Sequence, residues 1–390
     1  MSRRYYIVVL AVCIALISGL GATGQSRMVY RLDSCYTSQA RFQNLVGNVA
    51  VAIDDSVIYK KSFGYQNIEK KILNTDSSSF DIGSVTKIFT ATAVLQLKEK
   101  GLLQLDDNYA KYFPEFPYPE ITIRQLLAHT SGLPAFELFD SLESAIPDKI
   151  FANEDVIPAL KLWHKPMNNK PGHGWYYSSI NYCLLAMLVE KLANSPFREY
   201  VHKNIFEPAG MAHSYLENFL TVKNDNNKAI NYEPLSLTTT QLERVDLLPR
   251  EKKIVYNYGG FSGPDGLVTT MEDMEHFDKA YFSGKIINNE SMEEAMTPVK
   301  LKNGMPVVTA PLLGKGVAGY GLGWYIGISP LLGRMVWHEG VRPGVKAIYM
   351  HNITKNQTIL IFENVHTKTN INPLVVAGLN IINNLPDFHD

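Results

Sequence analysis

The sequence predicts a protein of the mixed α/β class, more narrowly α+β, in which one antiparallel sheet is flanked by helices. Two observations carry this prediction. Runs that favour strands occur near the start, over residues 48–63, and again near the end, over residues 319–362. The stretch between them contains apolar runs of helical length with capping signals. A sheet built from both termini, with a mostly helical lobe inserted between its halves, accounts for this order.

The length of 390 residues suits one large bilobal domain. Within a domain over residues 25–390, we expect a sheet lobe from about 25–80 and 300–390, and a helical lobe over about 81–299. A hydrophobic content of 46% excludes a disordered chain. The formal net charge of −1 gives no indication of a nucleic-acid partner.

Residues 1–24 have the features of a secretory signal peptide. The basic start, Met1 to Arg4, is followed by an apolar run from Tyr5 to about Ile17 and then by small residues up to Gly24. The apolar run is short for a membrane-spanning helix. The sequence therefore predicts export to the periplasm or the medium with cleavage near Gly24. The alternative is an uncleaved segment that anchors the protein in a membrane.

Three cysteines are present, and Cys13 lies inside the predicted signal. Export would allow Cys35 and Cys183 to form a disulfide. Cys183 lies in an apolar helical stretch, where a buried thiol is more usual. Both states are compatible with the sequence.

The first elements are a hairpin and a helix. Asp54-Asp55 separates two strand-like runs, residues 48–53 and 56–63, which predicts an antiparallel pair around a tight turn. Residues 88–97 contain no Gly or Pro and few polar positions, which suits a buried helix. Basic residues and a glycine over 98–101 indicate its end.

Two further helices are expected in the middle of the chain. Thr122 can cap a short helix that ends at the stop signals of Gly132 and Pro134. A turn over residues 171–182 leads into a second apolar helix over residues 183–192. Residues 217–258 are rich in Asn, Thr and charge and indicate a variable excursion.

The last third of the chain returns to strands. After a glycine turn at residues 263–266, Thr270 caps a helix with acidic residues in its first turn. A final amphipathic helix is expected from about Pro373 to Leu385. Between these helices we expect successive strands over residues 319–326, 335–338, 345–350 and 357–362.

Ser84 and Lys87 stand three residues apart at the start of the first helix. Positions i and i+3 share a helix face, so the hydroxyl and the amine can come within hydrogen-bonding distance. The purely structural interpretation is a serine that caps the helix and a surface lysine that is unrelated to it. Lys87 precedes an apolar run, however, and a lysine in apolar surroundings is costly unless it is paired or neutral. This cost favours a functional pair.

Two aromatic residues near loop ends are further candidates. His129 ends the short helix that begins after Thr122. We expect its ring to form hydrogen bonds with the backbone and to hold the loop beside the site, rather than to act as a catalytic base. Tyr177 lies at a loop-to-helix junction, where a tyrosine can be a core anchor or a proton-transfer group.

Three motifs resemble those of the serine β-lactamase and penicillin-binding-protein superfamily, closest to its class C, carboxypeptidase and esterase branch. The S-x-x-K motif runs from Ser84 to Lys87, the second motif aligns with Tyr177-Ser178-Ser179, and the third aligns with His338-Glu339-Gly340 in a His-x-Gly form. The resemblance extends from about residue 40 to 365 and implies a β-lactamase/transpeptidase-like fold. Accessory stretches that also match are residues 126–133, 266–270 and 319–324.

The resemblance implies a role for each motif residue. Ser84 would be the nucleophile, Lys87 its base, and Tyr177 the group that passes a proton to the leaving group. Backbone N–H groups of Ser84 and Val341 would line the oxyanion hole. No metal ion and no cofactor are implied. The implied substrate-binding residues are Ser179, His338, Glu339, Gly340 and Val341.

Three departures from the family pattern concern the substrate. Ser179 stands where the branch usually has an asparagine that binds a substrate amide, although Asn181 is near and is a candidate substitute. His338 replaces a lysine, so a fixed positive charge is lost unless the ring is protonated. Glu339 replaces a Thr or Ser. Pointing inward, it would repel a substrate carboxylate unless Arg342 offsets it; pointing away, it is a solvated strand residue.

These observations predict an exported serine hydrolase that cleaves an ester or amide through an acyl-enzyme on Ser84. Its substrate would be a small-molecule ester, amide or peptide, which makes it an esterase, a D-amino-acid peptidase or a weak β-lactamase. The alternative is a non-catalytic penicillin-binding or scaffold relative that keeps the fold. Membrane contact is expected only if the signal segment is uncleaved, and the sequence indicates no oligomeric state.

Overall fold

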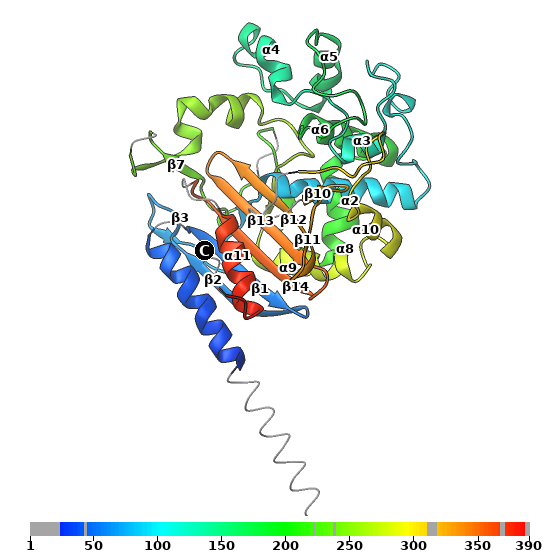
Figure 1. Cartoon of the computed structure of the whole chain (residues 1–390). Helices are drawn as coiled ribbons and strands as arrows, with labels where there is room; N and C mark the ends of the chain where they lie inside the picture. The colour runs from blue at the N-terminus through cyan, green and yellow to red at the C-terminus, as the bar shows by residue number, and fades with distance from the viewer. Residues whose placement is uncertain are drawn as a thin grey trace, which may run out of the picture.

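The computed structural model describes residues 24–42, 45–220, 223–236, 239–309, 318–366 and 371–386. Its centre is a seven-stranded antiparallel sheet in the order β10-β11-β12-β13-β14-β1-β2 (Figure 1). The sheet joins both ends of the chain, as predicted, because β1 pairs with β14. Its strands are β1 (Gly47–Ile53), β2 (Ser56–Phe63), β10 (Ala318–Tyr320), β11 (Tyr325–Ser329), β12 (Gly333–Arg342), β13 (Val345–Asn352) and β14 (Gln357–Glu363).

The predicted first hairpin is confirmed. β1 and β2 pair antiparallel around Asp54 and Asp55, which have positive φ angles of 49° and 60°. Two consecutive left-handed residues form the kind of turn that matches the twist of paired strands, and Asp tolerates this conformation better than most residues.

The single strand predicted over residues 319–326 is wrong. The chain reverses there, and β10 and β11 are antiparallel neighbours. The Gly321 N–H donates to the Trp324 carbonyl at 2.9 Å, and Gly323 has a φ of 84°. Since glycine adopts this left-handed conformation without a steric penalty, the reversal falls at Gly323.

Helices cover one face of the sheet and form the helical lobe behind it (Figure 1). The predicted caps are present: the Thr122 hydroxyl accepts from the Gln125 N–H at the start of α3 (Ile123–Leu127), and the Thr270 side chain accepts from the Asp273 N–H. We call the core on this side the helical-lobe core; it includes Phe89, Leu184, Phe277 and Tyr349. Its longer helices are α2 (Thr86–Glu99), α6 (Ile180–Ala193) and α9 (Met271–Phe282).

Shorter elements complete the fold. The remaining helices of the helical lobe are α4 (Asp140–Ala145), α5 (Val156–Lys161), α7 (Phe197–Val201), α8 (Glu207–Ala209) and α10 (Asn289–Ala295). Small sheets are formed by β3 (Tyr65–Asn67) with β4 (Ile72–Leu73), by β5 (Phe80–Asp81) with β9 (Leu267–Thr269) and β6 (Tyr215–Leu216), and by β7 (Tyr232–Pro234) with β8 (Leu242–Arg244). The excursion predicted over residues 217–258 therefore contains one small hairpin.

The opposite face of the sheet is covered by α11 (Asn372–Ile382) and by a helix over residues 24–41 (Figure 1). We call the core on this side the α11-side core; it includes Leu32, Tyr36, Trp337, Ile348 and Leu379. The final helix was predicted over residues 373–385, close to the observed bounds.

Cys35 and Cys183 do not pair with each other. Cys35 packs against the α11-side core, whereas Cys183 is buried in the helical-lobe core, so the sheet lies between them. The predicted signal lies almost entirely in residues 1–23, outside the described residues. Within the described ranges, none of the helices has the length and apolar character that a membrane crossing requires.

Candidate active site

Ser84 lies in a turn that is held from several sides. The turn, η1 (Gly83–Val85), connects β5 to α2, and Gly83 has a positive φ of 49°. The Gly83 N–H donates to Asp81 Oδ1 at 2.8 Å, while Thr86 Oγ1 donates to the Gly83 carbonyl at 2.7 Å. Thr86 Oγ1 also accepts from the Leu267 N–H at 3.1 Å. These bonds fix the backbone that presents the Ser84 hydroxyl.

Lys87 is fully buried one turn further along α2 and reaches back to the serine. Its Nζ donates to Ser84 Oγ at 2.9 Å and to the Pro264 carbonyl at 2.9 Å. Burial lowers the pKa of the amine to about 7; the Asp265 carboxylate opposes this shift and the Arg342 guanidinium adds to it. A substantial fraction of Lys87 is therefore unprotonated at neutral pH, as a general base requires.

Tyr177 completes the group. Its ring centroid lies 5.0 Å from Lys87 Nζ, and its hydroxyl shares a hydrogen bond with the Ser84 side chain. Burial raises the pKa of the phenol, and the bond to Ser84 only partly counteracts this. Tyr177 therefore keeps its proton at neutral pH. The structure brings together the three residues of the predicted catalytic set.

His129 has the expected structural position. The residue is buried with a φ of 56°, and its Nδ1 accepts from the Ser178 N–H at 3.1 Å. Its ring centroid lies 4.3 Å from that of Tyr177. Burial and the nearby Lys87 lower the pKa of the ring well below its usual value, so His129 is neutral. The histidine thus holds the loop that carries Tyr177.

The suggested replacement of the missing asparagine by Asn181 is wrong. Asn181 is fully buried, where its Oδ1 accepts from Ser131 Oγ at 2.7 Å and its Nδ2 lies 3.2 Å from His129 Nδ1. This amide is used to support the loop. Ser179, one residue before α6, is partly exposed beside the Tyr177 loop.

His338 lies on β12 with its ring directed toward the helical lobe. Its Nδ1 lies 2.7 Å from the Glu339 carbonyl, and its Nε2 lies 3.1 Å from the Tyr320 hydroxyl. Because a carbonyl can only accept, Nδ1 carries the proton and Nε2 accepts from Tyr320. Burial, together with the positive charge of the nearby Lys87, lowers the pKa of the ring to about 3. His338 therefore supplies no positive charge at neutral pH.

Glu339 lies on the other face of the sheet, which corrects its assignment to substrate binding. It stands opposite Ile348, a member of the α11-side core, and its Oε1 accepts from Asn372 Nδ2 at 3.3 Å. The physical reason is strand alternation, since consecutive residues point to opposite faces. Arg342, three residues later, points to the site face and cannot offset Glu339.

Gly340 and Val341 bring the backbone of β12 against the nucleophile turn. A Cβ on Gly340 would overlap the Ile82 carbonyl oxygen and come within 3.2 Å of the Ser84 nitrogen. A Cβ on Gly83 would meet the Val341 nitrogen at 3.3 Å. The two segments that carry the predicted oxyanion donors are therefore adjacent. The Val341 side chain itself is 55% exposed.

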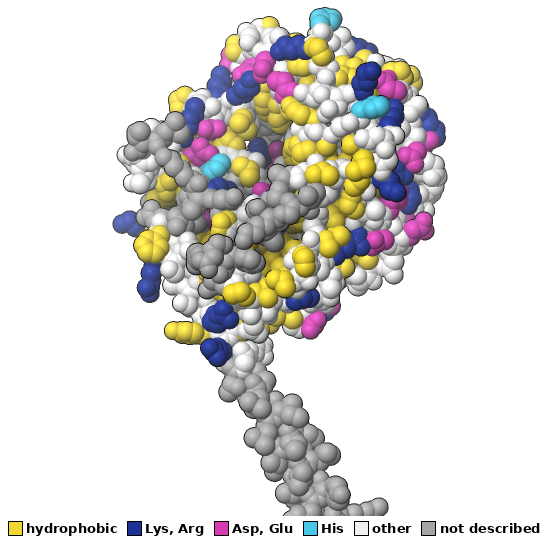
Figure 2. Space-filling model, in the orientation of Figure 1, with side chains coloured by type: hydrophobic (Ala, Val, Ile, Leu, Met, Phe, Trp, Pro, Cys, Tyr) yellow, Lys and Arg dark blue, Asp and Glu magenta, His cyan; other side chains and the backbone are white. Residues whose placement is uncertain are grey.

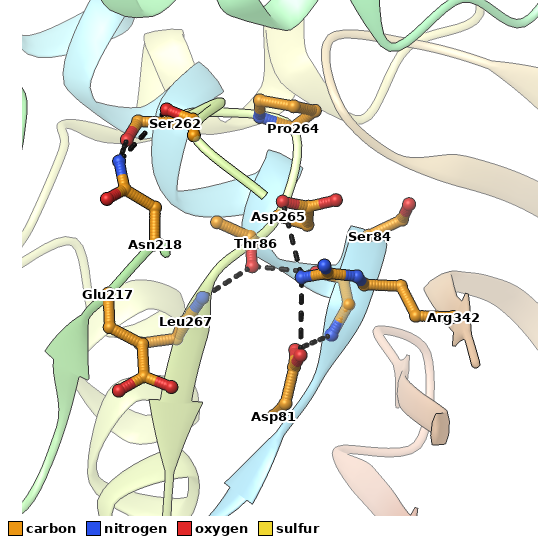
Figure 3. A network of polar contacts seen from close by, with 12 residues as sticks. Asp81, Ser84, Thr86, Glu217, Asn218, Ser262, Pro264, Asp265, Leu267 and Arg342 are labelled. Carbon is orange, nitrogen blue, oxygen red and sulfur yellow. Dashed lines mark hydrogen bonds and ion pairs between the residues drawn. The ribbon is translucent and has the colours of Figure 1, made fainter. Parts of the chain in front are cut away.

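Sequence reasoning missed a charged network beside Ser84 (Figure 3). Arg342 Nη1 lies 3.3 Å from Asp81 Oδ2 and 3.5 Å from Asp265 Oδ1. The three residues are far apart in the chain, and no local spacing connects them. Their proximity follows from the pairing of β5 with β9 and from the packing of β12 against η1.

A cavity of about 370 Å³ adjoins this network. Its charged lining draws on several loops, and basic and acidic side chains are visible within the hollow below the helical lobe in Figure 2. Among the described residues, no group of three or more His, Cys, Asp or Glu side chains is placed to hold a metal ion. The cavity is lined in part by Asp81, Lys228, Arg244, Phe261, Asp265 and Arg342.

The chain is similar to known proteins over most of its length. The family model described as Beta-lactamase matches residues 38–372. Penicillin-binding protein 4* of Bacillus subtilis (strain 168) is 32% identical over 322 residues, which cover 82% of this chain and 68% of that protein.

Two solved structures have the same fold. A penicillin binding protein from Bacillus halodurans superposes with a TM-score of 0.73 at 25% identity, covering 89% of this chain and 98% of that one. A D-amino acid amidase from Ochrobactrum anthropi SV3 has a TM-score of 0.73 at 20% identity, with coverage of 93% and 99%.

Proposed function

The chain belongs to the beta-lactamase family, and we propose that it is a serine hydrolase in which Ser84 forms an acyl-enzyme with an ester or amide substrate. One observation carries the proposal. A fully buried lysine amine, with a pKa lowered to about 7, lies 2.9 Å from the Ser84 hydroxyl. A serine hydroxyl is a weak nucleophile unless an adjacent base removes its proton, and Lys87 has the position and pKa for that task.

The proposed cycle uses residues already placed together. Lys87 accepts the Ser84 proton while Oγ bonds to the substrate carbonyl carbon, and the N–H groups of Ser84 and Val341 stabilise the resulting oxyanion. Tyr177 gives its proton to the leaving alcohol or amine as the C–O or C–N bond breaks, and regains one from the Lys87 ammonium. A water molecule then attacks the acyl carbon and gives a proton to Lys87. The C–Oγ bond breaks, Ser84 Oγ takes that proton back from Lys87, and the carboxylic acid is released.

The charges around Ser84 favour substrates without a carboxylate. His338 is neutral, Glu339 lies on the opposite face, and the Arg342 guanidinium is already placed between two carboxylates. Among the described residues around Ser84, this leaves only Lys87, itself partly neutral, as a cation that is not neutralised by a carboxylate. Esters and amides are therefore preferred over β-lactams, whose carboxylate needs a positive partner.

The second candidate function is penicillin binding without efficient turnover. It is favoured by the relative at 32% identity, which is named a penicillin-binding protein. The amidase among the fold neighbours supports amide substrates as compatible with this architecture. We also propose export, supported by the basic and then apolar start of the sequence; cell fractionation with N-terminal sequencing tests this point.

Intact-mass spectrometry tests the function directly. The protein is exposed separately to a fluorophosphonate, to a short-chain p-nitrophenyl ester and to a penicillin, with Ser84→Ala as the matched control. We expect a fluorophosphonate adduct on the wild type that the variant lacks, together with ester turnover. Removing the nucleophile should reduce turnover by about 10⁴-fold or more, because the remaining groups of such sites give only limited catalysis.

The other outcomes separate the alternatives. A long-lived penicillin adduct without ester turnover would indicate the penicillin-binding role, and rapid penicillin hydrolysis would indicate a β-lactamase. A folded protein that takes no label from any of the three reagents would exclude catalysis and leave the scaffold role.

A further inference from the structure

Arg342 connects three separate segments of the site. It ends β12, the strand that carries His338 and Gly340, and its Nη1 contacts carboxylates of two other segments at 3.3 and 3.5 Å (Figure 3). The side chains of Arg342, Asp81 and Asp265 are only 21%, 13% and 20% exposed. Charges that are this far removed from water interact more strongly than surface ion pairs do.

Each carboxylate belongs to a segment with its own task. Asp81 accepts the Gly83 N–H at 2.8 Å and so fixes the turn that presents Ser84. Asp265 directly follows Pro264, whose carbonyl accepts from Lys87 Nζ. The position of that carbonyl sets the direction of the amine, since a neutral lysine must donate to Pro264 while its lone pair faces the Ser84 hydroxyl.

We propose that Arg342 is a positioning residue that holds the Ser84 turn and the Pro264 carbonyl in register and that, with Asp265, sets the basicity of Lys87. The inference rests on the proposed function, in which Lys87 is the base. Arg342 acts through Lys87 and Ser84 and is assigned no contact with the substrate.

Arg342 and Asp265 are the main charged groups that act on the Lys87 amine, because its other neighbours are neutral. The histidines are neutral because burial lowers their pKa values, and the tyrosines and the cysteine are protonated because burial raises theirs. The Arg342 charge lowers the pKa of Lys87 and the Asp265 charge raises it. The groups that face the amine from the surrounding elements are His129, Tyr177, Tyr182, Cys183, Asp265, His338 and Arg342.

Two single variants should move the titration of Lys87 in opposite directions. Arg342→Gln leaves both carboxylates without their cation, so the pKa of Lys87 should rise by about one unit. Asp265→Asn is isosteric and removes a negative charge, so that pKa should fall by a similar amount. The double variant removes one charge of each sign, so the pKa of Lys87 should return toward the wild-type value. Its kcat should nevertheless be lower than that of the wild type, because the bridge between the segments is absent.

NMR of protein labelled with ¹³Cε-lysine measures this titration without requiring turnover, and the spectrum of Lys87→Met assigns the signal. The pKa read from the acid limb of the pH profile of kcat/KM for a p-nitrophenyl ester should shift in the same direction as the Lys87 titration in each variant. The control is Arg244→Gln, which removes the same charge from a more exposed arginine–aspartate pair, with Asp246, on the wall of the same cavity. It should leave the Lys87 signal and the acid limb unchanged.

The inference is overturned if the Lys87 titration stays at the wild-type position in both single variants, or moves in the same direction in both. If Arg342→Gln does not fold, Asp265→Asn alone decides through its predicted downward shift. Absence of Ser84-dependent turnover in the wild type counts against the proposed function instead, because the NMR titration is read independently of it.

Discussion

Lys87 is the residue at which activity and stability conflict most directly. Its pKa falls from 10.5 to about 7 on burial, so the unfolded chain binds more protons than the folded one between these values. The free energy of unfolding should therefore rise with pH from about 7 to 10.5. At pH 7 and below, the buried amine costs the folded state several kcal/mol, roughly in proportion to the shift.

Lys87→Met should consequently yield a more stable but inactive protein. Methionine has a similar shape without the buried charge, and we expect a gain of about 1–4 kcal/mol at pH 6. The gain should shrink as the pH rises from about 7 toward 10.5, because the folded wild type, whose amine is then neutral, becomes more stable relative to an unfolded chain whose amine still binds a proton. Urea denaturation at pH 6 and at pH 9.5 measures the difference; an equal gain at both pH values would show that the amine is not the cause.

Residue positions were predictable to the extent that local spacing determines them. Three residues of helix bring Lys87 to Ser84, and the sequence shows that spacing directly. Tyr177 required the family resemblance, since its loop is placed by contacts with His129. The face of Glu339 was not predictable, because a shift of one residue in strand phase reverses every side chain.

At the scale of elements, the site depends on the contact between β12 and the η1 turn. No side chain fits between them at Gly340, where a methyl group would overlap the Ile82 carbonyl. The peptide groups of the two segments can then converge on one oxyanion. A Cβ atom at position 340 would force the two segments apart. The N–H donors would then no longer be positioned to stabilise the oxyanion.

Gly340→Ala should lower kcat/KM by about 10²-fold or more and destabilise the fold by roughly 1–3 kcal/mol. The matched control is Gly327→Ala on β11, where an added methyl group meets only the ring of Trp337, at 3.0 Å. Ester kinetics normalised to fluorophosphonate-titrated sites, with thermal unfolding of both variants, provide the comparison. Equal losses in the two variants would mean that the β12–η1 contact has no special importance.

Elements with strong end signals were predicted well, and those with weak ones were not. The Thr122 and Thr270 caps and the turn at Asp54-Asp55 each combine a residue type with a fixed hydrogen-bond or φ requirement. The reversal between β10 and β11 lacks such a signal, because three glycines in a short run are compatible with a strand, a bulge or a turn.

At the scale of the whole molecule, the sheet separates the site from a second core. Ser84 and its partners lie on the face with the helical lobe, while α11 and the helix over residues 24–41 cover the other face. Tyr36 joins these two helices to the sheet. Its ring stacks on Tyr59 at 5.6 Å, and its hydroxyl donates to the Leu374 carbonyl at 3.3 Å.

Tyr36→Ala should therefore destabilise the protein by about 3–5 kcal/mol, as is typical when a large buried aromatic side chain is truncated. Turnover per titrated Ser84 should stay at the wild-type level well below the unfolding temperature. Tyr30→Ala, on the same helix but 74% exposed, is the control and should change neither quantity. A loss of turnover in folded Tyr36→Ala would contradict the separation of the two faces.

This two-sided arrangement has a consequence for how the protein can change over generations. Substitutions in the α11-side core can raise or lower the free energy of unfolding without altering the chemistry at Ser84. Of the three motifs, only Glu339 is directed to that side. Stability gained in that core offsets the loss of stability caused by substitutions around Ser84. Substitutions on the site face can thus change the specificity at a cost in stability, and stabilising substitutions on the α11 side can compensate for that cost.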